Sequence, residues 1–176
     1  MDILPVLKTG RLIVIYAPDA ARAESMTLIA ELGLRGAVTI LDGGNLYRPY
    51  QVATLLRRKT VDISGVAKRL FSRRAFTCYE MNTLLNSTPS LNQPYLILDL
   101  LKTFYDDHVP AYEACRLLKS CLDQIQRLVL SGPVVVTLAP PLAEERGFLL
   151  EQVCGQADQV MVKEAPVCQP TQPSLF

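Results

Sequence analysis

The sequence contains no tryptophan and only one histidine, His108, among its 176 residues. Catalytic triads of the Ser-His-Asp and Cys-His kinds need a histidine that other groups orient. His108 follows Asp106 and Asp107 in a stretch that we expect to be a solvated loop. The five cysteines form no CxxC motif, so buried reduced thiols are expected rather than a disulfide framework or a zinc site. The sequence therefore predicts no metal site, no cofactor and no catalytic residues.

Long apolar runs are also missing. No stretch reaches the roughly 20 apolar residues that a membrane span needs, and the first residues lack the pattern of a signal peptide. The net charge of +1 favours neither nucleic acid nor a membrane surface as a bulk partner. We expect a cytoplasmic protein with no membrane contact, whose 49% hydrophobic content can fill the core of one domain.

Short apolar runs alternate with helical patterns along the chain. The runs expected to be strands are Leu12–Tyr16, Ala37–Leu41, Val66–Phe71, Tyr95–Asp99, Pro133–Leu138 and Gln159–Lys163. The expected helices are Asp19–Leu32, Pro49–Arg58, Thr77–Asn86 (with a Thr77/Glu80 capping box) and Pro110–Leu130.

This alternation predicts an α/β fold of three layers, with a doubly wound, mostly parallel sheet. Residues 1–163 would form the core domain. Residues 164–176 contain three prolines and few groups to bury, so we expect a flexible, proline-rich C-terminal tail.

Three segments carry a family resemblance, and a fourth would follow from it as the sensor strand. They are Leu41–Pro49 (LDGGNLYRP), Arg73–Leu85 (RRAFTCYEMNTLL), Leu96–Asp99 (LILD) and Pro133–Thr137 (PVVVT). Their order resembles the ATPase core of RecA-like recombinases, closest to the RadA-type branch. The resemblance spans roughly residues 10–163 and implies the RecA-like P-loop NTPase fold. An unrelated doubly wound α/β domain is the alternative.

The loop that the resemblance aligns with the phosphate-binding loop is degenerate. No glycine occurs between Tyr16 and Gly33, and a left-handed alanine costs about 1–2 kcal/mol. The lysine position holds Ala23, the hydroxyl position holds Glu24, and Asp19 is expected to cap the helix where phosphate would bind. The degenerate site thus includes Ala17, Asp19, Arg22, Ala23 and Glu24. A shift of one residue, to Arg22 and Ser25, would still leave it without glycines.

Two further positions depart from the family pattern. The resemblance places the glutamate that activates water at Gly44, and glycine offers no base. It places the Thr-Asn-Gln sensor at Thr137-Leu138-Ala139, where only the threonine matches. Asp99 matches the metal-coordinating aspartate, although an aspartate at a strand end can instead cap the next turn. The resemblance therefore implies an inactive ATPase homologue, not an enzyme.

One segment is strongly basic. Residues 57–74 contain seven basic residues and one acidic residue, so their net charge is +6 and the rest of the chain carries −5. This cluster is interpreted either as a weak, salt-sensitive surface for nucleic acid or an acidic partner, or as an ordinary solvated face. It comprises Arg57, Arg58, Lys59, Lys68, Arg69, Arg73 and Arg74.

The last residues, Gln172-Pro173-Ser174-Leu175-Phe176, resemble the clamp-binding peptide Gln-x-x-Leu-Phe of bacterial polymerases and repair proteins. Leu175 and Phe176 would fill an apolar pocket, and Gln172 would bind at its rim. A tail without a partner is the alternative.

Two functions remain open at this stage. The first is a non-catalytic accessory or scaffold protein of DNA repair or recombination that binds a recombinase, a polymerase or the sliding clamp. The second is a SulA-like regulator that binds a polymerising partner and has no role on DNA. Homo-oligomers are compatible with both.

Overall fold

Six parallel strands form one sheet in the order β3-β2-β4-β5-β1-β6, in a computed structural model that describes residues 4–141 and 144–164. The α/β fold with a doubly wound parallel sheet is thereby confirmed. The strands are β1 (Leu12–Tyr16), β2 (Val38–Asp42), β3 (Leu70–Arg74), β4 (Tyr95–Leu98), β5 (Val134–Leu138) and β6 (Gln159–Val162).

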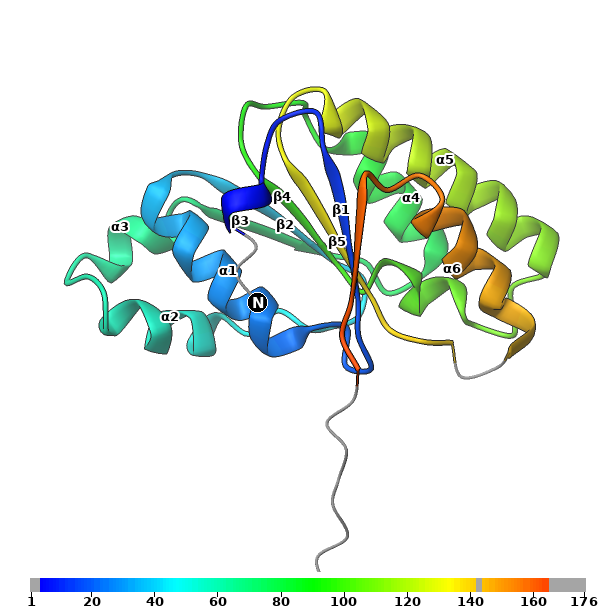
Figure 1. Cartoon of the computed structure of the whole chain (residues 1–176), viewed down its shortest axis with the longest axis horizontal. Coiled ribbons are helices and arrows are strands. Elements are labelled where there is room, and N and C mark those ends of the chain that lie inside the picture. Colours follow the sequence, from blue (N-terminus) through cyan, green and yellow to red (C-terminus); the bar gives the residue numbers. More distant parts are fainter. Residues whose placement is uncertain (1–3, 142–143, 165–176) are drawn as a thin grey trace, which may run out of the picture.

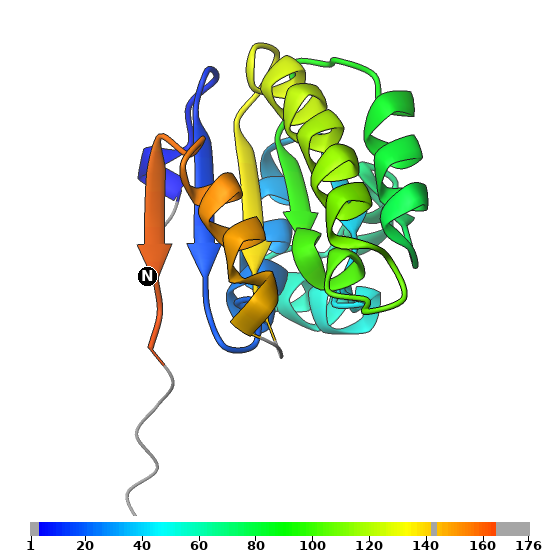
Figure 2. The same ribbon diagram turned by 90° about the vertical axis from the view of Figure 1, so that its right-hand side faces the viewer.

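Helices cover both faces of this sheet and make it the middle of three layers (Figure 1). One face is covered by α1 (Arg22–Arg35), α2 (Pro49–Arg57) and α3 (Ile63–Ala67). The other is covered by α4 (Cys78–Ser87), α5 (Ala111–Val129) and α6 (Gly147–Cys154) (Figure 2). Three short 3-10 helices complete the described elements: η1 (Leu4–Val6), η2 (Leu100–Phe104) and η3 (Glu144–Arg146).

Burial follows the apolar pattern of the sequence. Every residue of β2, β4 and β5 is buried, as expected for strands packed between two helical layers. The apolar face predicted for α5 is confirmed, because all eight of its members are buried: Ala114, Leu117, Leu118, Cys121, Leu122, Ile125, Leu128 and Val129. The edge strands β3 and β6 remain partly exposed.

The prediction of a strand at Val66–Phe71 was wrong in its position. The Asp62 side chain accepts a hydrogen bond from the Gly65 N–H (2.8 Å) and starts α3, so β3 begins only at Leu70. Helix α6 was not predicted, because its eight residues are too few to show a clear period.

Two smaller expectations are also settled. The Thr77 hydroxyl accepts from the Glu80 N–H (3.1 Å), which confirms the first bond of the capping box. The Glu80 carboxylate completes the box by accepting from the N–H of Phe76, the residue before the N-cap (2.7 Å). Cys78 and Cys121 are buried free thiols, whereas Cys115 and Cys154 are only partly buried. Cys168 lies outside the described residues, and no helix in the described ranges is long and apolar enough to cross a membrane.

Candidate functional site

The carboxyl ends of the parallel strands meet at one edge of the sheet, which is where α/β proteins commonly bind ligands. The β1–α1 turn, Asp99 after β4 and Ala139 after β5 lie together there, because β5 lies between β1 and β4. The turn after β2 lies farther along the same edge.

The β1–α1 turn is filled by its own side chains, and three of its N–H groups bond within the chain. Ala17, Ala20 and Ala21 are at most 1% exposed. The Ala17 N–H donates to the Leu138 carbonyl (3.0 Å), and the Ala20 N–H donates to the Ala17 carbonyl (3.0 Å). The Ala21 N–H donates to the Asp19 carboxylate (3.2 Å). These donors are therefore not available to cradle a phosphate.

The expectation that alanines keep this turn out of the left-handed region was wrong. Ala20 and Ala21 have φ values of 50° and 52°, in the region that favours glycine. Their burial explains why the conformation persists, since packing of the surrounding core offsets a local cost of about 1–2 kcal/mol per residue. The turn thus has left-handed backbone like a glycine loop, but methyl groups occupy its interior.

The predicted role of Asp19 as helix cap was also wrong. Helix α1 starts at Arg22, its N-cap residue is Ala21, and no side chain accepts from its first N–H groups. Asp19 instead closes the preceding turn through its bond to Ala21.

In the rest of the degenerate loop, the position predicted for the phosphate-binding lysine carries no cation. Arg22 and Ala23 are exposed at the start of α1. Glu24 forms an ion pair with Lys163, which follows β6, and the hydrogen bond from Lys163 lowers the pKa of the Glu24 carboxyl. Ser25, the hydroxyl in the one-residue shift, is 1% exposed, so its side chain is closed off from solvent. These residues do not fit a magnesium–triphosphate group.

Asp99 takes up the space at Gly44 that a side chain would need. A Cβ atom built on Gly44 would lie 2.5 Å from Asp99 Cβ and 2.6 Å from Asp99 Oδ2, which is closer than real contacts allow. A glutamate could therefore not replace Gly44 unless Asp99 moved. The lack of a side chain at Gly44 and the placement of Asp99 are therefore linked sterically.

The Asp99 side chain joins two strands and does not cap the next turn. Its carboxylate accepts from the Ala139 N–H (3.2 Å), and its own N–H donates to the Thr137 hydroxyl (2.9 Å). Asp99 precedes η2, but no N–H of η2 bonds to its side chain. Burial raises the pKa of the Asp99 carboxyl, whereas the bond from Ala139 opposes that shift.

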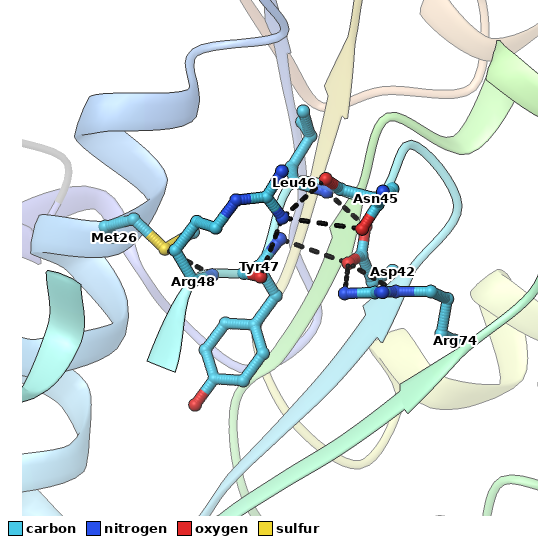
Figure 3. A network of polar contacts seen from close by, with 7 residues as sticks. All are labelled: Met26, Asp42, Asn45, Leu46, Tyr47, Arg48 and Arg74. Carbon is cyan, nitrogen blue, oxygen red and sulfur yellow. Dashed lines mark hydrogen bonds and ion pairs between the residues drawn. The ribbon is translucent and has the colours of Figure 1, made fainter. Parts of the chain in front are cut away.

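A second carboxylate, Asp42 at the end of β2, organises the neighbouring turn (Figure 3). It is 1% exposed and accepts from the N–H groups of Leu46 (2.8 Å) and Tyr47 (3.0 Å). The Arg74 guanidinium on β3 forms an ion pair with the same carboxylate at 3.1 Å. Asp42 had no predicted role, although an aspartate that ends a buried strand before two glycines was the available signal.

Two open grooves flank the end of β3. A groove of about 420 Å³ runs toward α4 and is lined by Arg73, Phe76 and Tyr79, among others. A groove of about 320 Å³ lies toward the β2–α2 turn and shares Arg73, Arg74 and Phe76 with the first. Phe76 is 71% exposed and Tyr79 is 49% exposed. Aromatic and basic groups are therefore accessible here.

The basic cluster is spread over several elements and is not gathered at one point. Arg57 ends α2 and is followed by Arg58 and Lys59, whereas Lys68 and Arg69 lie between α3 and β3. Arg73 and Arg74 lie in β3 itself, at its carboxyl end. Lys59 is paired with Glu31 and Arg74 with Asp42, so part of the predicted positive charge is neutralised locally.

Other predicted groups fall outside this edge. Gln172, Leu175 and Phe176 lie outside the described residues. The His108 side chain is 96% exposed and contacts Asp106, as expected for a solvated loop. Within residues 4–141 and 144–164, no group of three or more His, Cys, Asp or Glu side chains is placed to hold a metal ion.

Comparison with known proteins identifies no relative of this chain. No protein-family model matches the chain, and no curated protein matches it.

Proposed function

We propose that this chain is a non-catalytic, RecA-like accessory protein of DNA repair or recombination that acts by binding other proteins. One observation carries the proposal: the chain's own atoms occupy the places that a triphosphate and a catalytic glutamate would need. Buried alanines fill the β1–α1 turn, and Asp99 fills the space beside Gly44. An active ATPase of this family would need both places open.

The strand order supports the RecA-like part of this proposal. The resemblance requires the phosphate-loop strand, the metal-aspartate strand and the sensor strand to lie side by side. Strands β1, β4 and β5 do so, with β5 in the middle. Asp99 and Thr137 are also bonded directly, as neighbours at such a site would be.

The accessible groups support a binding role. The grooves at the end of β3 expose Phe76, Tyr79 and Arg73, and aromatic and arginine side chains are enriched where proteins bind partners. The C-terminal peptide ending in Leu175 and Phe176 provides a second attachment point, to the sliding clamp.

The test uses the full chain and three proteins of its own host: the recombinase, a repair polymerase and the sliding clamp. Each is immobilised, and binding of the chain is measured by surface plasmon resonance. We expect saturable binding to at least one of them. The Leu175→Ala/Phe176→Ala variant should lose clamp binding and keep the others. Binding to none of the three would reject the proposal, and co-purification of only a polymerising cell-division protein would favour the SulA-like alternative.

A further inference from the structure

The two edges of the sheet differ in charge. Within β3 and directly before it lie four cations, Lys68, Arg69, Arg73 and Arg74, and charged side chains on an edge strand discourage pairing with another strand. Strand β6 (Gln159–Val162) contains no charged residue. It pairs with β1, and no other described strand covers its outer side.

The charged residues that flank β6 are turned toward the chain's own core elements. The Lys163 ammonium forms an ion pair with Glu24 of α1. The Asp158 carboxylate accepts a hydrogen bond from the Leu12 N–H (2.7 Å). Neither charge is therefore free to repel a strand that approaches β6 from outside.

The outer backbone of β6 belongs to its two valines. The Lys163 N–H donates to the Tyr16 carbonyl (2.8 Å), so Lys163 faces β1. Because alternate residues of a parallel strand face the same neighbour, Met161 and Gln159 also face β1. The N–H and C=O groups of Val160 and Val162 therefore point away from the sheet.

The valine side chains add an apolar surface to this edge. Val160 is 39% exposed and Val162 is 64% exposed, and period-two alternation places both on the same face of the sheet. Met161 points to the opposite face and packs beside the core there. Strand β6 is the outermost strand on its side of the sheet (Figure 2). It thus combines backbone groups that no described strand pairs, exposed apolar side chains and no charged residue.

We propose that two copies of this chain associate through β6, which pairs antiparallel with β6 of the second copy. Antiparallel pairing about a twofold axis at Met161 sets Val160 opposite Val162 of the other copy. By symmetry, Val162 then lies opposite Val160 of the other copy. The outward backbone groups of both valines are then paired, and four valine side chains meet on one face. The two six-stranded sheets become one continuous sheet.

A second copy suits this edge better than another partner because the strand is complementary to itself. In the proposed register valine faces valine, and Gln159 faces Lys163 of the other copy. Like charges face each other only beyond the ends of the two strands, at Asp158 and Glu164 of the other copy. A twofold contact also closes on itself and leaves the basic β3 edges at the two outer ends. The inference does not rest on the proposed function and stands if that function fails.

The first test is the mass of the full chain in solution. We expect sedimentation equilibrium to give twice the 19.5 kDa of one chain. The Val162→Lys variant should raise the dimer dissociation constant at least about tenfold, because lysine at an edge opposes strand pairing. The matched control is Val61→Lys, since Val61 is fully exposed in the turn between α2 and α3, and it should leave the dimer intact. A monomer at every concentration, an unaffected Val162→Lys dimer, or open-ended growth of mass would overturn the proposal.

The second test fixes the register and does not depend on a disruptive variant. Met161→Cys is made in a background with Cys115, Cys154 and Cys168 replaced by serine, and the protein is oxidised. Residues on the twofold axis would form a non-hydrogen-bonded pair with Cα atoms about 4.5 Å apart, which a disulfide can span. We expect Met161→Cys to form a covalent dimer faster than Val160→Cys, which lies off the axis. Equal or reversed rates would contradict this register.

Discussion

The turn after β1 and the turn after β2 start from the same edge of the sheet, but they use that edge differently. After β1, the buried methyl groups of Ala17, Ala20 and Ala21 fill the turn, and the N–H groups of these residues bond within the chain. After β2, the buried Asp42 holds the turn from inside, and open grooves with Arg73 and Phe76 lie beside it. One part of the edge is closed, and the other is accessible.

We expect the closed part to determine the stability of the fold and the accessible part to determine binding. The closed part contains groups whose removal should change the free energy of unfolding, whereas the exposed residues of the accessible part should contribute little to it. Binding, in contrast, should depend on the accessible part. The predictions below test that division.

The largest expected effect is at Asp42, which supports the accessible turn from within. Asp42→Ala would leave two N–H groups and the Arg74 guanidinium without their acceptor, so we expect the free energy of unfolding to fall by about 3 kcal/mol. Urea denaturation measures this loss. The matched control is Asp123→Ala on the exposed side of α5, which should change it by less than about 0.5 kcal/mol. Similar losses for both variants would show that Asp42 does not organise this turn.

A smaller loss is expected at Gly44, which lies against Asp99 in the turn after β2. Gly44→Ala places a methyl group against Asp99 and should lower the free energy of unfolding by about 1–3 kcal/mol. In an Asp99→Gly background the same substitution should cost less, because both the Cβ atom and the carboxyl that the methyl group meets are gone. A double-mutant cycle by urea denaturation measures this coupling. Strictly additive losses would mean that the two residues do not compete for one space.

The raised pKa of Asp99 predicts a dependence on pH. A carboxyl whose pKa is raised in the folded state binds its proton more tightly there than in the unfolded chain. Its contribution to stability is therefore greatest at low pH and is lost as the pH rises through the folded-state pKa. Asp99→Asn cannot lose a proton, so its stability relative to wild type should increase as the pH rises above about 4. Denaturation of both proteins across a pH series measures the difference, and a constant or falling difference would contradict the shift.

The smallest effect on stability is expected in the accessible part. Phe76→Ala should change the free energy of unfolding by less than about 0.5 kcal/mol, because the ring is 71% exposed. The same variant should weaken binding to whichever host protein the wild type binds, while Tyr112→Ala, a similarly exposed aromatic on α5, should not. Plasmon resonance with both variants tests this contrast. Equal binding by wild type and Phe76→Ala would remove the β3 grooves from the binding surface.

Apolar periodicity was sufficient to predict the sheet and the buried face of α5. It could not place the start of β3, because Val66 and Leu70 are both apolar and only the cap at Asp62 separates helix from strand. At the candidate site, the missing glycines and lysine were visible in the sequence. The left-handed alanines, the contact of Asp99 with the space at Gly44 and the bonds of Asp42 were not, since they depend on which strands become neighbours.

Isothermal titration of the full chain with ATP and magnesium tests the central claim most directly. The closed β1–α1 turn predicts no saturable heat, with or without magnesium, because buried methyl groups fill its interior and the N–H groups of Ala17, Ala20 and Ala21 are bonded within the chain. Saturable, magnesium-dependent binding that is lost when Asp99 is replaced by alanine would contradict the account. It would indicate a working nucleotide site, as in an ATPase.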